Sequence, residues 1–133
     1  MDLFTEFERV SAQYGSNWTK LSERDQTLLV VWELEAEVNN GGFEQYFFNS
    51  AGDLARDAPS ALRRIGASKM ADVVEAANAT FGPKGPPANR EARQSQLESL
   101  VDTDESMFDA FDQRFTAYPD DLATLLAAYL ETA

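Results

Sequence analysis

The sequence predicts an all-α protein, a single-domain compact helical bundle of about seven to eight helices with no sheet. Three observations support this prediction. Apolar residues recur at three- and four-residue spacing along most of the chain, no stretch shows the alternation of a strand, and the breaks carry Gly, Pro, Asn or Ser. The 133 residues, of which 44% are hydrophobic, are expected to form one domain over residues 1–133. A chain of this length can bury a core that needs neither a metal nor a disulfide.

The N-terminal segment predicts one amphipathic helix followed by a loop. Apolar residues recur at helical spacing over residues 2–14, and Gly15 is expected to end this helix. In the loop over residues 15–20, Trp18 is expected to pack over the core, as large aromatic side chains usually do.

The next helix is expected to be the central one. Ser22 and Asp25 form a start like a capping box, and the helix should run to about Val38. Its residues are apolar on nearly all sides, which is typical of a buried helix. Glu33 and Glu37 are predicted to form its exposed strip, and a carboxylate pair for a metal or for acid–base chemistry is the alternative interpretation.

The stretch over residues 39–52, NNGGFEQYFFNSAG, combines two adjacent glycines with four aromatic rings. We expect a turn at the glycines that leads into a buried aromatic helix, because Gly and Asn tolerate positive φ. The amides of this stretch are expected to clamp the free backbone groups around the turn. The structural motif comprises Asn40, Gly41, Gly42, Phe43, Gln45, Tyr46, Phe47 and Asn49.

Two helices and a long break are expected in the middle of the chain. Residues 53–65 predict a helix interrupted near Pro59, with Gly66 as the residue that ends it. Ser68 is expected to cap the following helix. The loop over residues 82–89, GPKGPPAN, has no periodicity and is a candidate for a mobile rim.

The last third of the chain carries a row of acidic residues. A helix is expected from Arg90, capped by Asn89, with a break near residues 101–104 that bends the row. The final helix is expected to have Pro119 at its first position. The acidic stripe consists of Glu98, Asp102, Glu105, Asp109 and Asp112, and Asp120 and Asp121 follow at the start of the final helix.

Composition restricts the classes of function. The net charge is -12, and residues 98–133 hold nine acids against Arg114 alone, so nucleic acid and anionic membranes should repel the protein. Without histidine, zinc chemistry and Ser-His-Asp catalysis are not expected. The absence of cysteine, signal-peptide features and long apolar runs favours a cytoplasmic protein. We expect no cofactor and no metal, and either a monomer or a homodimer.

The acidic stripe is a sparse imitation of DNA phosphates. Two charges per seven helical residues correspond to roughly one per 5 Å of helix axis. One strand of B-DNA carries a charge about every 3.4 Å. Either Asp120 with Asp121 or Glu33 with Glu37 is expected to supply a second row. The alternative is that these acids form an ordinary solvated face, although lysine is absent from the stripe.

The motif NNGGFEQYFFNSAGD follows VVWELEAEV and precedes ALRRIGA, and it resembles the signature of the bacterial DNA-mimic protein type domain family. The match is good over about residues 28–81, and FDAFDQRFTAYPDDLATLLAAYL fits the family's C-terminal helices. The resemblance implies an all-α fold. For the best-understood members of the family, the resemblance also implies an acidic surface that imitates duplex DNA and occupies the DNA-binding site of a regulator.

The sequence therefore predicts a non-enzymatic interaction protein whose acids bind a basic, DNA-binding protein. Its partner-binding residues would be Glu33 and Glu37 with the acidic residues between Glu98 and Asp121 named above. One alternative is an immunity or antitoxin-like protein that neutralises a cationic toxin, with apolar contacts around residues 82–89. The other is an enzyme in which Glu33 and Glu37 bind a divalent metal.

Overall fold

The structure, a computed structural model, is built from helices and describes residues 1–14 and 18–133. No strand occurs in the described part of the chain, which confirms the all-α prediction. The helices, including two 3-10 helices named η, are α1 Leu3–Tyr14, η1 Trp18–Lys20, α2 Glu23–Phe48, η2 Ser50–Asp57, α3 Ala58–Arg64, α4 Ser68–Ala79, α5 Arg90–Thr103, α6 Asp109–Thr116 and α7 Leu122–Thr132. The predicted helix end at Gly15 lies outside the described residues.

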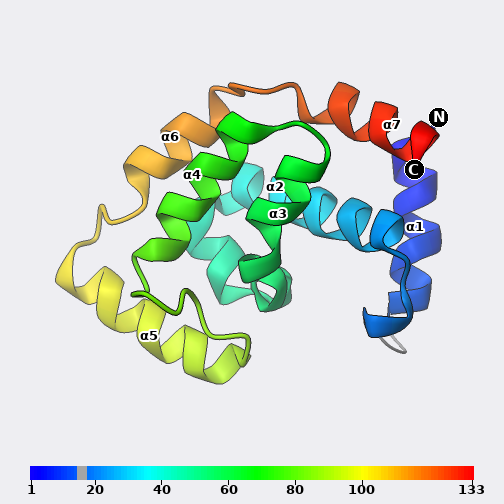
Figure 1. Ribbon diagram of the computed structural model, residues 1–133. Helices are drawn as coiled ribbons and strands as arrows, with labels where there is room; N and C mark the ends of the chain where they lie inside the picture. Colours follow the sequence, from blue (N-terminus) through cyan, green and yellow to red (C-terminus); the bar gives the residue numbers. More distant parts are fainter. Residues whose placement is uncertain (15–17) are drawn as a thin grey trace.

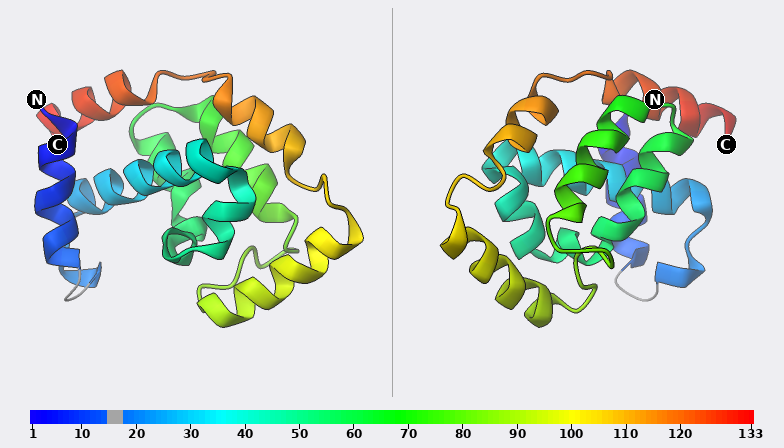
Figure 2. Two further views of the ribbon diagram at one scale, coloured as in Figure 1. Left: turned by 180° about the vertical axis from the view of Figure 1, so that it is seen from behind. Right: turned by 60° about the vertical axis from the view of Figure 1, so that its left-hand side comes forward.

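The long helix α2 runs through the middle of the molecule, and the other helices surround it (Figure 1). The helices α1 and α7 lie near its N-terminal end, and α5 and α6 lie near its C-terminal end (Figures 1 and 2). As expected, the Ser22 side chain accepts a hydrogen bond from the backbone N–H of Asp25 and caps the helix. Buried side chains occur on all sides of α2, and Trp18 packs against the core. The prediction of a central helix is confirmed.

The Gly-Gly pair kinks α2 instead of forming a separate loop. Gly41 and Gly42 have non-helical backbone angles, and φ of Gly42 is +73°. A Cβ atom at Gly42 would lie 2.5 Å from Oδ2 of Asp112, so this position excludes side chains both by conformation and by space. The kink redirects the second part of α2 into the core.

The second part of α2 forms the centre of an aromatic core. Phe43 contacts Phe115 edge-to-face at a centroid distance of 5.7 Å. Phe47 contacts Phe81 at 4.9 Å and Phe108 at 5.4 Å. These rings connect α2 to α6, to the α5–α6 connection and to the residue before the 82–89 loop. The prediction of a buried aromatic helix is therefore confirmed for Phe43, Tyr46 and Phe47, but Phe48 is exposed.

The middle of the chain differs from the prediction in how its helices begin. Residues 50–57 form a 3-10 helix, and Pro59 lies in the first turn of α3. Gly66 follows α3 with φ +87°, as expected for the residue after a helix end. The prediction that Ser68 caps α4 is wrong. The backbone N–H of Met70 donates instead to Oδ2 of Asp120, at 2.8 Å.

The last helix begins later than predicted. Pro119 precedes α7, which starts at Leu122 with Asp121 as its N-cap. Tyr118 adopts a positive φ of 51°, and its hydroxyl donates to Glu35 and accepts from the Asn39 side chain. These contacts hold the α6–α7 connection against α2, and Asp120 and Asp121 of this connection cap helices.

Arg93 of α5 is fully buried, and the sequence analysis did not identify it. Its Nε donates to the carbonyl oxygen of Phe47 at 2.6 Å, and Nη2 donates to the carbonyl of Asn49 and the carboxylate of Asp53, each at 2.9 Å. Nη1 donates to two carbonyl oxygens of the 82–89 loop. Arg93 thereby connects α2, η2, the loop and α5.

No helix in the described part of the chain is both long and apolar enough to cross a bilayer.

Replacing Arg93 with Met should strongly destabilise the protein. The substitution keeps an unbranched side chain but leaves several buried carbonyl oxygens without a donor and leaves Asp53 with Arg90 alone, so the free energy of unfolding should fall by about 3–5 kcal/mol. Urea unfolding followed by circular dichroism measures this loss.

The matched control is Arg90→Met, which removes a more exposed ion pair with the same carboxylate, that of Asp53. Its cost should stay below about 1 kcal/mol. Equal losses in the two variants would contradict the role assigned to Arg93.

Candidate functional site

Four acids of the predicted stripe are free at the surface formed by α5, α6 and their connection. Glu98 and Asp102 lie on α5, Glu105 lies in the connection, and Asp109 begins α6. All four are exposed, and none makes a side-chain hydrogen bond or ion pair within the described residues. The helix breaks at residues 104–108, so the row is bent, as the sequence analysis anticipated (Figure 2).

Asp112 has a structural role that the sequence analysis did not predict. Its Oδ1 accepts a hydrogen bond of 2.8 Å from the backbone N–H of Phe43, the first residue after the glycine kink. Partial burial raises the pKa of Asp112, while the hydrogen bond from Phe43 acts in the opposite direction. Asp112 therefore caps the aromatic part of α2 from a distant position in the sequence.

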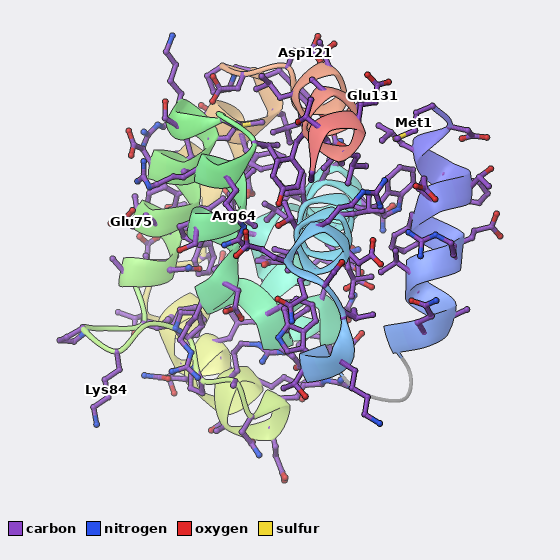
Figure 3. All side chains as sticks on the ribbon, turned by 45° about the vertical axis from the view of Figure 1, so that its right-hand side comes forward. Met1, Arg64, Glu75, Lys84, Asp121 and Glu131 are labelled. Carbon is purple, nitrogen blue, oxygen red and sulfur yellow. The ribbon has the colours of Figure 1, made fainter. Side chains whose placement is uncertain are left out.

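Asp120 and Asp121 also cap helices. Asp120 accepts the backbone N–H of Met70 and so caps α4, although it is 50 residues away in sequence. Asp121 accepts from the backbone N–H and the hydroxyl of Thr124 in the first turn of α7, and these bonds lower its pKa. Asp121 remains exposed at the start of α7 (Figure 3). The predicted second acidic row at these positions is a pair of helix caps.

The prediction that Glu33 and Glu37 form an exposed strip is wrong. Both side chains are partly buried. Oε2 of Glu37 accepts hydrogen bonds from the side chains of Gln45, at 2.7 Å, and Asn49, at 3.0 Å. The side-chain amides of Gln45 and Asn49 thus bind the carboxylate of Glu37 on the other side of the kink. We had expected them to bind free backbone groups instead.

Glu33 differs from Glu37 because its carboxylate accepts no hydrogen bond from a described residue. Burial raises the pKa of Glu33, and the nearby charges of Glu37 and Asp53 raise it further. In the described part of the chain, no group of three or more acidic side chains is arranged to hold a metal ion.

A groove between the end of α2 and α5 contains residues that the sequence analysis missed. It has a volume of about 510 Å³, and its lining includes Phe48. Two carboxylates absent from the predicted site, Glu44 and Glu91, lie in it together with the predicted Glu98 and Asp102. Helical spacing places Glu44 and Phe48 on one face of α2, but only the fold shows that α5 packs beside that face.

Comparison with known proteins identifies one family. The family model described as DMP19-like protein matches residues 19–133. No curated protein and no solved structure matches the chain.

The capping role of Asp112 predicts that Asp112→Ala destabilises the fold. The loss of the acceptor for the Phe43 N–H should lower the free energy of unfolding by about 1 kcal/mol. The matched control is Asp109→Ala in the same helix, which removes a free carboxylate and should change stability by less than about 0.5 kcal/mol. Chemical unfolding of both variants tests this, and a larger loss for Asp109→Ala would refute the assignment.

Glu33→Gln should stabilise the protein at neutral pH. Because the folded-state pKa of Glu33 is raised, the folded state binds its proton more tightly than the unfolded state does. The wild type therefore loses stability as pH rises from the ordinary value of 4.5 through the folded pKa. Glu33→Gln should therefore become more stable than the wild type across this pH range. Glu23→Gln, which changes an exposed glutamate of the same helix, is the control and should show no such gain in stability.

Urea unfolding at several pH values measures the difference between the two proteins. A difference that stays constant from acidic to neutral pH would show that Glu33 does not titrate as proposed.

Proposed function

The chain belongs to the DMP19-like protein family, and we propose that it is a non-enzymatic interaction protein that imitates DNA. Its acidic surface would occupy the nucleic-acid-binding surface of a basic protein, such as a DNA-binding regulator. The supporting observation is the row of free carboxylates on α5, its connection and α6: Glu91, Glu98, Asp102, Glu105 and Asp109. We call this row the acidic edge.

The acidic edge is a row of acids without counter-ions, which distinguishes it from two other groups of acids on the surface. Elsewhere, arginines neutralise acids: Arg24 pairs with Glu6 and Asp25, and Arg63 pairs with Asp72 and Glu75. Within the described residues, no side-chain ion pair involves a carboxylate of the acidic edge. An uncompensated row of this kind attracts a basic surface over a distance set by the ionic strength.

The carboxylates of the acidic edge are farther apart than the phosphates of a DNA strand, so they would imitate some of the phosphates and not every one. Glu91, Glu98 and Asp102 follow one another at roughly 10 and 6 Å along the axis of α5, from a rise of about 1.5 Å per residue. Phosphates of one DNA strand are about 3.4 Å apart. Glu44 adds a carboxylate on the opposite side of the groove, so it replaces Glu33, Glu37, Asp120 and Asp121 as the expected source of a second row.

The structure offers less support for an immunity or antitoxin-like role against a cationic toxin than for DNA mimicry. That alternative places apolar contacts around residues 82–89, and a groove of about 410 Å³ does lie there, lined in part by Phe81 and Pro83. The same groove is lined by Arg56 and Lys84, and Lys84 extends from the loop into solvent (Figure 3). These cations would repel a basic partner at this place.

Displacement of DNA from a basic regulator tests the proposal. Purified helix-turn-helix regulators bound to labelled operator DNA are titrated with the protein at low salt in a mobility-shift assay. The wild type should release the DNA, and its effect should weaken steeply with added salt. A variant with Glu98→Gln, Asp102→Asn, Glu105→Gln and Asp109→Asn should lose the effect.

The control changes net charge equally at four exposed acids elsewhere: Glu8→Gln, Glu23→Gln, Asp57→Asn and Glu131→Gln. This variant should retain most of the wild-type effect. Two results would show that the acidic edge is not the binding surface. In the first, both variants displace DNA with the same potency as the wild type. In the second, neither variant displaces DNA.

A further inference from the structure

We propose that the groove between the end of α2 and α5 receives an arginine side chain of the basic partner, with the Phe48 ring as its stacking surface. This inference rests on the proposed function, because it names the place where the partner would be anchored. It adds an aromatic contact to a surface that would otherwise bind through charge alone.

Phe48 differs from the other aromatic residues of the stretch over residues 39–52. Its side chain is 53% exposed, whereas Phe43 and Phe47 of the same helix are completely buried. The helix end that carries it is fixed, because the Gln94 side chain of α5 donates a hydrogen bond of 2.7 Å to the carbonyl oxygen of Phe48. The ring is therefore displayed to solvent from a fixed backbone, which costs less entropy on binding than a flexible loop would.

The groove around Phe48 is acidic on both sides. Glu44 contributes from α2, and Glu91, Glu98 and Asp102 contribute from α5. Within the described residues, none of these four side chains forms a hydrogen bond or an ion pair. The lining contains no lysine or arginine, and the volume of about 510 Å³ lies within the range of roughly 300–1,000 Å³ typical of ligand sites.

The chemistry of the groove selects a guanidinium group. An arginine can place its flat face on the Phe48 ring while its N–H groups point toward carboxylates on either side. A lysine ammonium can pair with one carboxylate, but it is more strongly hydrated and stacks less well. An anion would be repelled, and an apolar side chain would remove water from the carboxylates without replacing their hydrogen bonds.

The test uses two end-capped peptides, each with about six basic residues alternating with glycine, one containing arginine and the other lysine. Isothermal titration calorimetry at low salt should show tighter binding of the arginine peptide to the wild type. Phe48→Leu, which keeps every charge, should weaken the arginine peptide by roughly three- to tenfold and change the lysine peptide much less.

Phe4→Leu is the matched control. Phe4 is 54% exposed, nearly the same as Phe48, but lies on α1 at the opposite end of the molecule (Figure 1). This variant should bind both peptides as the wild type does. Thermal unfolding of both variants shows whether the fold is intact, and Glu98→Lys provides a second groove variant, which should weaken both peptides.

Three outcomes would overturn the inference. Equal binding of the arginine peptide by Phe48→Leu and the wild type would show that the Phe48 ring does not contact the peptide. This result would leave the proposed displacement of DNA by the acidic edge unaffected. Equal affinity of the wild type for the two peptides would show that the groove does not select arginine. If Phe48→Leu instead changes only self-association of the protein, the groove is an interface between copies of this chain.

Discussion

One buried guanidinium attaches α5 to the end of the central helix α2. Arg93 donates to the carbonyl oxygens of Phe47 and Asn49, and these carbonyl groups lie at the end of α2. The chain can approach the guanidinium closely because Gly52 has no side chain, and a Cβ atom there would lie 2.9 Å from Nε of Arg93. The same arginine holds the 82–89 loop, so that a segment rich in Pro and Gly is attached to the core.

The position of α5 has a direct consequence for the surface. Because Arg93 and Gln94 attach α5 to the end of α2, the helix is held beside Phe48 with a groove between them. The acids of α5 need no partner within the protein, since Arg93 provides the attachment. The interaction that builds the fold is thus separate from the charges that we propose for binding.

The acidic residues divide into two groups with different physical roles. Asp112, Asp120 and Asp121 accept backbone N–H groups at helix starts, where a negative charge is favourable. The acidic edge, from Glu91 to Asp109, makes no such contacts and keeps its charge available to solvent. A count of acids along the sequence cannot distinguish these groups, because two of the caps act across 50 or more residues.

Sequence periodicity predicted the helical class, the central helix and the core rings, since each depends on local spacing. The glycines predicted a turn at the place where α2 is in fact kinked. Sequence periodicity failed where contacts are distant in sequence. Arg93 lies among polar residues of an apparently ordinary helix, and only the tertiary structure shows that it is enclosed by carbonyl oxygens. Glu37 looked exposed because the amides that bind it come from beyond the kink. Phe48 belongs to the aromatic stretch, but it lies on the same exposed face of α2 as Glu44.

Hydrogen–deuterium exchange of the protein, free and bound to a regulator that it displaces from DNA, tests the central claim most directly. The account predicts slower exchange on binding in α5, residues 104–108, α6 and the end of α2, with no change in α1 and α3. Protection confined to the 82–89 loop, or to α1 and α7, would contradict it.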